Sequence, residues 1–194
     1  LLRNSLIGAF VALPIPALAL FRDLAPAGTL EEKLVHTIWE KGVRLTRDPN
    51  GVPIKASDVT IGSAFHVIPE NLLELEEGFL DEKAKAAVLL MRLPLDALNE
   101  TEDRKSWSYD GIVAYSKICT HVGCPVALYE QQTHNLLCPC HQSQFDVSNH
   151  CAVIFGPAAR PLPQLPITID SEGYLVAQSD FLEPVGPSYW ERLR

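Results

Sequence analysis

The chain reads C-T-H-V-G-C at residues 119–124 and C-P-C-H-Q-S-Q-F at residues 138–145, and these two segments decide the fold. We call them box one and box two. The pairs Cys119-x-His121 and Cys138-x-x-His141 each place a thiol and an imidazole within four residues, close enough for one loop to hold one side of a metal centre. The four candidate ligands are Cys119, His121, Cys138 and His141. This mixed set predicts a metal centre bound between two loops.

Three kinds of site use such residues, and the spacing favours one of them. Structural zinc is a common partner of Cys/His quartets, but its ligands usually run as C-x2-4-C and H-x3-5-H pairs. A disulfide framework would leave His121 and His141 without a role. A [2Fe–2S] cluster in which two histidines replace two cysteines on one iron requires this mixture. We favour that cluster, with zinc and disulfides as the alternatives.

The boxes resemble those of the Rieske iron–sulfur proteins of cytochrome bc-type quinol oxidases, where C-T-H-x-G-C is followed by C-P-C-H-x-S. The resemblance is strong over residues 112–163, and the N-terminal half loosely resembles the long insertions of actinobacterial-type members. It implies an all-β fold, a small antiparallel β-barrel or sandwich, with one [2Fe–2S] cluster. By resemblance the ligands are Cys119, His121, Cys138 and His141.

The second cysteine of each box points to one branch of this family. By resemblance, Cys124 and Cys140 form a disulfide that ties the two loops together. Rieske ferredoxins and ring-hydroxylating oxygenases generally lack this pair, so its presence favours the quinol-oxidising branch. A structural disulfide also indicates an oxidising compartment, such as the outer face of a bacterial membrane.

The resemblance assigns further roles around the cluster. His121 and His141 would be the catalytic residues that accept a hydrogen bond and a proton from a quinol, with His141 as the main acceptor. Val122 would belong to an apolar docking surface, and the Ser143 hydroxyl would bond a bridging sulfide. The segment G-P-A-A-R-P at 156–161 would be the proline-rich loop that covers the cluster.

Phe145 departs from the pattern of high-potential relatives, which carry a tyrosine that donates to a ligand sulfur. A phenyl ring cannot donate a hydrogen bond. Such a bond is worth roughly 1.5–3 kcal/mol, or about 60–130 mV at roughly 59 mV per tenfold for one electron. The sequence therefore predicts a lower-potential cluster, matched to menaquinol rather than ubiquinol.

Length and charge exclude other classes of protein. The chain has 194 residues, 47% of them hydrophobic, which is enough for one sizeable core or a small domain with an anchor. Its net charge of −8 argues against nucleic-acid binding.

Residues 6–21 form an uncharged run that begins after Arg3 and ends before Arg22. As a helix it would extend about 24 Å, short of the roughly 30 Å hydrocarbon core, and Pro14 and Pro16 would bend it. A transmembrane helix end, a signal segment and a buried helix are the alternatives. Because the chain starts with Leu1 rather than Met, we expect a processed or truncated protein.

The resemblance sets the expected domain boundaries. Residues 1–22 would be the end of a transmembrane anchor and residues 23–28 (D-L-A-P-A-G) a hinge. Residues 29–194 would be the Rieske domain, with a cluster-binding subdomain at about 112–163.

Short apolar or alternating segments bounded by turn residues predict the strands. They lie at 42–48, 61–68, 87–93, 112–118, 126–129, 135–138, 167–170 and 174–177. Residues 94–99 could form one helical turn. The odd cysteine, Cys151, is expected to be a small buried residue, and residues 70–110 receive no assigned role.

Taken with the resemblance, these features predict the Rieske subunit of a bacterial cytochrome bc complex in the cell membrane, its cluster domain on the outer face. It would oxidise menaquinol at the cytochrome b subunit, release protons, and pass one electron to a cytochrome c haem, with a terminal oxidase as a further supercomplex partner. The alternatives are the Rieske subunit of another exported enzyme, such as an arsenite oxidase, and a zinc-stabilised binding module.

Overall fold

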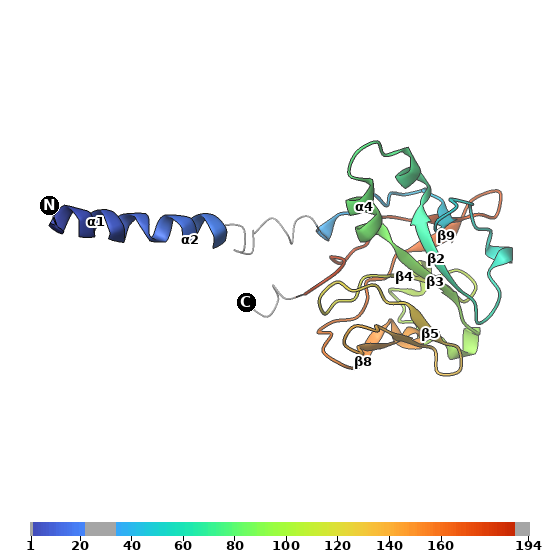
Figure 1. The fold of residues 1–194 in the computed structure, drawn as a ribbon. Coiled ribbons are helices and arrows are strands. Elements are labelled where there is room, and N and C mark those ends of the chain that lie inside the picture. Colours follow the sequence, from blue (N-terminus) through green and yellow to red (C-terminus); the bar gives the residue numbers. More distant parts are fainter. Residues whose placement is uncertain (1, 22–33, 189–194) are drawn as a thin grey trace. The chain divides into compact units, whose positions relative to one another are not determined.

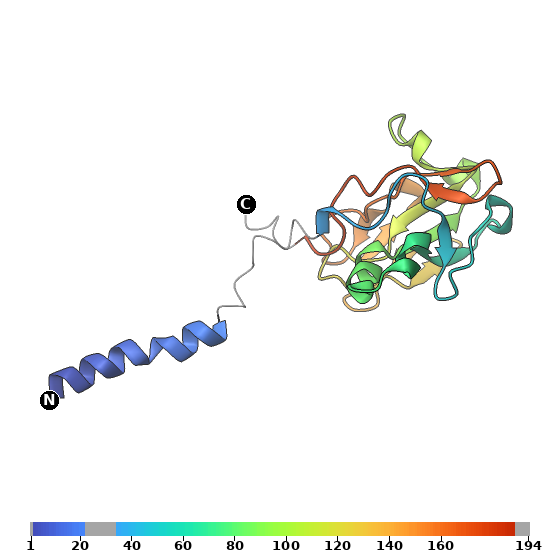
Figure 2. The same ribbon diagram turned by 90° about the horizontal axis from the view of Figure 1, so that it is seen from above.

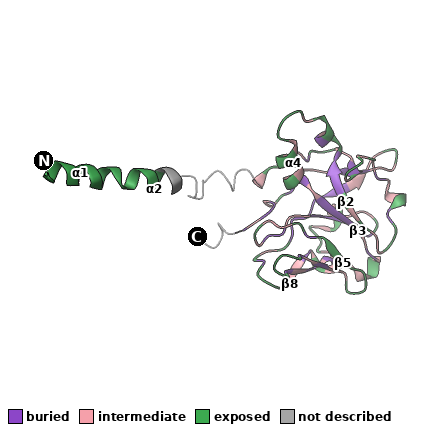
Figure 3. Ribbon diagram, in the orientation of Figure 1, coloured by how far each residue is buried: buried purple, intermediate pink, exposed green. Residues whose placement is uncertain are grey.

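The computed structural model describes residues 2–21 and 34–188, and the chain divides into two compact units, residues 1–33 and 34–194. The first unit contains α1 (Leu2–Ala12) and α2 (Pro14–Phe21). The break at Leu13 has a simple cause, since Pro14 has no N–H to donate and occupies the first position of α2. All side chains described in the two helices are exposed (Figure 3).

Neither of these helices, nor any other in the described residues, combines the length and hydropathy of a membrane span. The hinge expected at 23–28 lies outside the described residues.

The second unit is built on an antiparallel sheet of order β1-β2-β3-β4. Its strands are β1 (Leu45–Arg47), β2 (Ala64–Pro69), β3 (Val88–Arg92) and β4 (Ile112–Ser116). The hairpin of β9 (Ile167–Ile169) and β10 (Leu175–Ala177) lies beside β1 through the bridge Arg44–Val176. The bridge Tyr115–Gln164 joins β4 to the segment before β9. Together these contacts curl the sheet towards a barrel.

A second antiparallel sheet carries the order β5-β6-β7-β8. Its strands are β5 (Leu128–Glu130), β6 (Asn135–Leu137), β7 (Gln144–Asp146) and β8 (Ala152–Phe155). In Figure 1, β5 and β8 lie together on one side of β3 and β4. Strands β7 and β8 were not expected from the sequence, because β7 begins inside box two and a bulge between Gln144 and Phe145 interrupts the pairing of β7 with β8.

Strands β3 and β4 form the wall between two hydrophobic cores. From β3, Val88 and Leu90 face one core, whereas Leu89 and Met91 face the other. Alternate residues of β4 divide in the same way, with Ala114 in the first core and Val113 in the second. A strand buried on both faces needs apolar side chains at every position, which explains the uninterrupted apolar run of β3.

Short helices fill the connections. They are η2 (Ala56–Asp58), η3 (Glu70–Glu74), α4 (Phe79–Ala86), η4 (Leu95–Ala97), η5 (Lys105–Trp107) and η6 (Val147–Asn149). The polar segment around η5 projects from the body of the domain (Figure 2). The expected all-β fold is confirmed, as are the helical turn at η4 and the strands that became β1, β2, β3, β4, β6, β9 and β10.

Candidate metal centre

Both boxes fold into loops of the same design. In box one, the Cys119 N–H donates to the Cys124 carbonyl (2.8 Å) and the Gly123 N–H donates to the Cys119 carbonyl (3.0 Å). In box two, the Cys138 N–H donates to Ser143 (2.9 Å) and the Gln142 N–H donates to Cys138 (3.0 Å). In each loop the first cysteine therefore bonds to the residues four and five positions later. The same two backbone hydrogen bonds therefore close both loops.

The left-handed backbone at the fifth residue of each box makes this closure possible. Gly123 has φ +86° and Gln142 has φ +62°. Glycine adopts this region without penalty, whereas glutamine is strained there. Box two therefore stores backbone strain at Gln142 that box one avoids at Gly123.

The two thiols lie together inside the protein. Cys119 and Cys138 are each 1% exposed, and their side chains are within hydrogen-bonding range of each other. Burial raises the pKa of the Cys119 thiol to about 11, against the lowering effect of hydrogen bonds from the His121 N–H and the Ser143 hydroxyl. Burial therefore favours the neutral thiol, and both sulfurs could be buried as thiolates only with a bound cation to offset their charge.

The two imidazoles lie together nearer the surface. The ring centroids of His121 and His141 are 4.7 Å apart, and the ring planes are nearly perpendicular, at 86°. His141 is exposed and His121 is half-buried. A pair of sulfur donors beneath a pair of nitrogen donors matches the division of ligands between the two irons of a Rieske cluster. The donor set therefore fits a [2Fe–2S] group.

A disulfide between Cys124 and Cys140 joins the boxes, as the resemblance implied. Their Cα atoms are 6.5 Å apart, within the usual range for a disulfide. The Cys138 sulfur lies within 4.8 Å of both disulfide sulfurs. These three sulfurs do not form a metal site of their own, because two of them are already joined covalently.

The loop at 156–161 contacts both boxes. Its Ala158 N–H donates to the Ser143 hydroxyl (3.1 Å), and its Arg160 carbonyl accepts from the Thr120 hydroxyl (2.6 Å). Gly156, at φ +90°, passes so close to box two that an added Cβ would lie 2.6 Å from the Ser143 Cα. The expected position of this loop against the cluster-binding loops agrees with these contacts.

The other residues singled out in the sequence divide into buried and exposed. Phe145 and Cys151 are fully buried in the second core, beside Cys119 and Cys138. The buried position expected for Cys151 is confirmed, and burial raises its thiol pKa well above the usual range. Val122, which follows the two candidate ligands of box one in the chain, is 52% exposed, as a docking residue would be.

One part of the site was missed in the sequence. Residues 184–188 have no periodic pattern, yet Ser188 is 1% exposed and bonds box one through both its N–H and its hydroxyl. Arg160 donates from Nη2 to the carbonyls of Pro184 (2.6 Å) and Gly186 (3.1 Å). Irregular segments leave no signal in residue spacing, so only the fold could reveal this contact.

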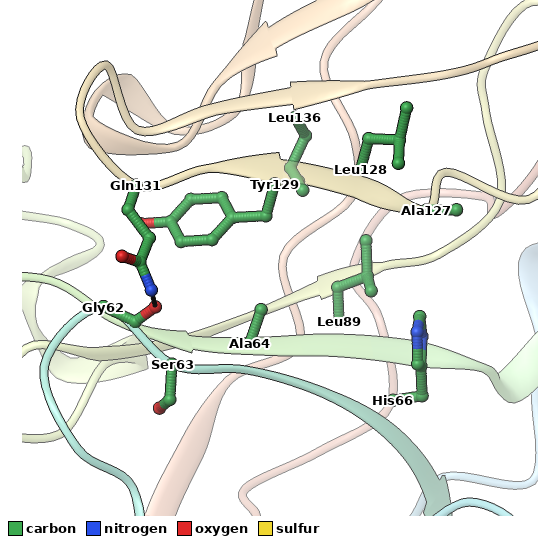
Figure 4. Close-up of a pocket in the computed structure, with 10 residues that line it drawn as sticks. All are labelled: Gly62, Ser63, Ala64, His66, Leu89, Ala127, Leu128, Tyr129, Gln131 and Leu136. Atoms are coloured by element: carbon green, nitrogen blue, oxygen red, sulfur yellow. Dashed lines mark hydrogen bonds between the residues drawn. The ribbon is translucent and has the colours of Figure 1, made fainter.

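A pocket of about 540 Å³ lies between the two sheets, at a distance from both boxes (Figure 4). Leu89 of β3 and Leu128 of β5 face each other across it, and the Gln131 side chain closes one end by donating to the Gly62 carbonyl (2.5 Å). None of its described lining residues belongs to a box. The pocket therefore lies between the β1-β2-β3-β4 sheet and the β5-β6-β7-β8 sheet.

Comparisons with known proteins identify similar chains. The family described as Rieske [2Fe-2S] domain matches residues 97–166. The cytochrome bc1 complex Rieske iron-sulfur subunit of Streptomyces coelicolor is 52% identical over 193 residues, which are 99% of this chain and 54% of that protein. The same subunit of Streptomyces lividans is 54% identical over 173 residues, which are 89% of this chain and 99% of the relative. The chain thus spans about half the length of the first relative.

Among solved structures, the soluble domain of the Rieske protein II (soxF) from Sulfolobus acidocaldarius is similar, with 20% identity and a TM-score of 0.39. The similarity covers 56% of this chain and 71% of that chain.

Proposed function

This chain belongs to the Rieske iron–sulfur subunits of cytochrome bc1 complexes, and from that premise we propose that it transfers single electrons from menaquinol to a cytochrome c haem. The observation that carries the proposal is the pair of buried thiols beneath a pair of more exposed imidazoles. The sulfur side of the proposed cluster would lie inside the protein. The imidazole side, which would contact the quinol, would lie at the surface.

The ligands we assign are Cys119 and Cys138 to one iron, and His121 and His141 to the other. Support comes from the common design of the two loops and from the sulfur and nitrogen pairs that they form. Once bound, such a cluster supplies a one-electron redox centre at roughly −150 to +300 mV. The disulfide holds the two ligand loops at a fixed separation.

His141 is the proposed proton acceptor. It is the more exposed imidazole of the two, so its outer nitrogen can accept a hydrogen bond from a quinol hydroxyl and then take the proton. His121, half-buried beside it, completes the catalytic pair. Val122, the residue after His121, supplies exposed apolar surface, which suits a docking contact with cytochrome b.

Menaquinol is the proposed substrate because Phe145 offers no hydroxyl to the cluster sulfurs. The ring is completely buried in the core that contains Cys119 and Cys138, so no water can replace the missing donor there. A redox titration of the purified protein tests this substrate. A midpoint potential as high as that of tyrosine-bearing, ubiquinol-oxidising relatives would refute it.

The proposed setting is a cytochrome bc complex in the cell membrane, with the cluster domain on the outer face and with cytochrome b, cytochrome c and a terminal oxidase as partners. The disulfide supports an oxidising compartment. Residues 1–22 are proposed as the end of the anchor, 23–28 as the hinge and 29–194 as the Rieske domain, with its cluster-binding subdomain at about 112–163. Additional prolines within 23–28 should slow turnover of the complex and leave the cluster spectrum unchanged.

Low-temperature EPR of the reduced protein tests the cluster assignment. We expect the rhombic signal of a reduced, histidine-ligated [2Fe–2S] centre. A silent spectrum together with one bound zinc would refute electron transfer and leave a metal-stabilised β domain. Co-purification with a large molybdenum subunit, in place of cytochrome b, would reassign the chain to another exported oxidoreductase.

A further inference from the structure

The C-terminal strap, defined here as residues 184–188, is bonded to three separate parts of the domain. The Val185 N–H donates to the Leu34 carbonyl (2.9 Å), at the start of the second unit. Arg160 of the covering loop donates to the strap carbonyls of Pro184 and Gly186. At its end, Ser188 bonds Thr120, which lies between the two ligands of box one. The strap is therefore fixed in place at both ends before Ser188 reaches the site.

Ser188 makes two hydrogen bonds to one oxygen atom. The Thr120 carbonyl accepts from the Ser188 N–H (3.0 Å) and from the Ser188 hydroxyl (2.7 Å). Both side chains are buried, Thr120 at 0% and Ser188 at 1% exposure. In a buried, low-dielectric position each of these bonds polarises its acceptor more strongly than it would in water.

The carbonyl that Ser188 bonds belongs to the same peptide unit as the His121 N–H. That N–H in turn donates to the sulfur of Cys119. Because a peptide unit is planar, an oxygen fixed from one side also fixes the direction of the N–H on the other. Hydrogen bonding at the oxygen also makes the N–H a stronger donor. Ser188 thus lies one peptide away from a ligand sulfur that it does not touch.

We propose that Ser188 is a positioning residue for the cluster: through the Thr120–His121 peptide it directs and strengthens the N–H···S bond to Cys119 and so raises the reduction potential. Hydrogen bonds to ligand sulfurs stabilise the more negative, reduced cluster. The inference rests on the proposed [2Fe–2S] ligation. It adds that the C-terminal strap, which is far from both boxes in sequence, influences the reduction potential of the cluster.

The test compares the cluster-loaded full chain with its Ser188→Ala variant. The backbone N–H still bonds Thr120 in the variant, so the strap keeps its position while the hydroxyl is lost. Ser179→Ala is the matched control, since the Ser179 hydroxyl donates to the Asp180 carbonyl (2.8 Å) on the same C-terminal segment. Ser188→Thr tests rescue because it restores a hydroxyl donor.

We expect the electron affinity of Ser188→Ala to fall about threefold, a shift of about 28 mV at 59 mV per tenfold. Resonance Raman spectra should show altered iron–cysteine stretching bands in this variant. Ser179→Ala should match the unmodified chain in both measurements, and Ser188→Thr should return towards it. A role confined to holding the fold would lower thermal stability and leave the potential and the bands unchanged, which would overturn the inference.

Loss of the cluster, either in Ser188→Ala or in the unmodified chain, also has a defined meaning. If Ser188→Ala fails to retain a cluster, Ser188→Thr is compared with Ser188→Cys, whose thiol is a weaker donor. A lower potential for the thiol supports the relay, and equal potentials overturn it. If the unmodified chain itself gives no EPR signal, the proposed ligation fails, which is distinct from a loaded chain whose potential ignores Ser188.

Discussion

At residue 145, a buried phenyl ring offers the simplest test of how this chain sets its potential. Phe145→Tyr should raise the midpoint potential, because the new hydroxyl would be enclosed in the core beside the ligand sulfurs of Cys119 and Cys138. One hydrogen bond to a charged sulfur, at about 1.5–3 kcal/mol, corresponds to a rise of about 60–130 mV. Redox titration by circular dichroism measures the change.

The control for this substitution is Phe155→Tyr. Phe155 is 57% exposed on β8, so its added hydroxyl would meet water and the potential should not change. Equal potentials for Phe145→Tyr and the unmodified chain would show that the ring at 145 does not limit the potential, and the argument for menaquinol would lose its main support.

His150 is expected to contribute to the acid sensitivity of the domain. Its Nε2 accepts a hydrogen bond from the Thr101 N–H (3.2 Å), which requires the neutral ring. Burial lowers the pKa of His150, and the neighbouring Arg104 lowers it further, against the opposite influence of Glu100 and Asp103. The unfolded chain therefore binds this proton more readily. The stabilisation is present above about pH 6.5 and is lost as the pH falls below that value.

His150→Asn should reduce this loss. Position 150 has φ +51°, a conformation that asparagine tolerates well. Melting temperatures between pH 5 and pH 8 should fall less steeply on acidification in the variant than in the unmodified chain. Because the two proteins differ only at position 150, the difference between the two curves isolates the contribution of this residue. Parallel curves would contradict the prediction.

At the scale of elements, the turn after β8 controls how closely the covering loop approaches box two. Gly156→Ala should release the cluster faster, since the new Cβ would meet the backbone of Ser143 and Gln142. We expect a loss of about 1–3 kcal/mol from overpacking, in addition to about 1–2 kcal/mol for the positive φ. Cluster absorbance followed over time at fixed temperature measures the release.

Gly173→Ala separates these two contributions. Gly173 has a similar φ, +83°, but a Cβ added there would meet no described atom within 4 Å. This variant should show the backbone strain in thermal unfolding and retain the cluster as the unmodified chain does. If both variants release the cluster at the same rate, contact between the loop and box two does not protect the site.

The elements also show how far a sequence can be interpreted. The boxes gave the ligand candidates because metal ligands must recur at short, fixed spacings, and the run at β3 predicted a buried strand because both its faces are covered. Strands β7 and β8 have three and four residues and were hidden by the motif and by a bulge. The role of Ser188 depends on contacts with residues 68 positions away, which no local pattern records.

Across the whole molecule, the disulfide should stabilise the two boxes more than it stabilises the β1-β2-β3-β4 sheet. Its two cysteines are 16 residues apart, and a loop of this length corresponds to about 3 kcal/mol of stabilisation. The double variant Cys124→Ser and Cys140→Ser should therefore lose its cluster at a lower temperature, whereas the core that contains Leu90 and Ala114 should unfold later. Absorbance reports the cluster, and far-ultraviolet circular dichroism reports the sheets.

Cys151→Ala is the matched cysteine variant. Cys151 is buried in the second core and has no disulfide, so its loss should leave the cluster in place. Simultaneous loss of absorbance and of sheet structure in the double serine variant would show that the two cores unfold as a single unit.

The closeness of Cys138 to the disulfide also has a chemical consequence during maturation. With a sulfur within 4.8 Å of both Cys124 and Cys140, the Cys138 thiolate can attack either of them and release the other as a new thiolate. If Cys138 binds iron as proposed, the metal would occupy the electron pair that makes this attack. Metal binding would then prevent thiol–disulfide exchange among the three cysteines. The Cys124–Cys140 pairing would persist only while the metal remains bound.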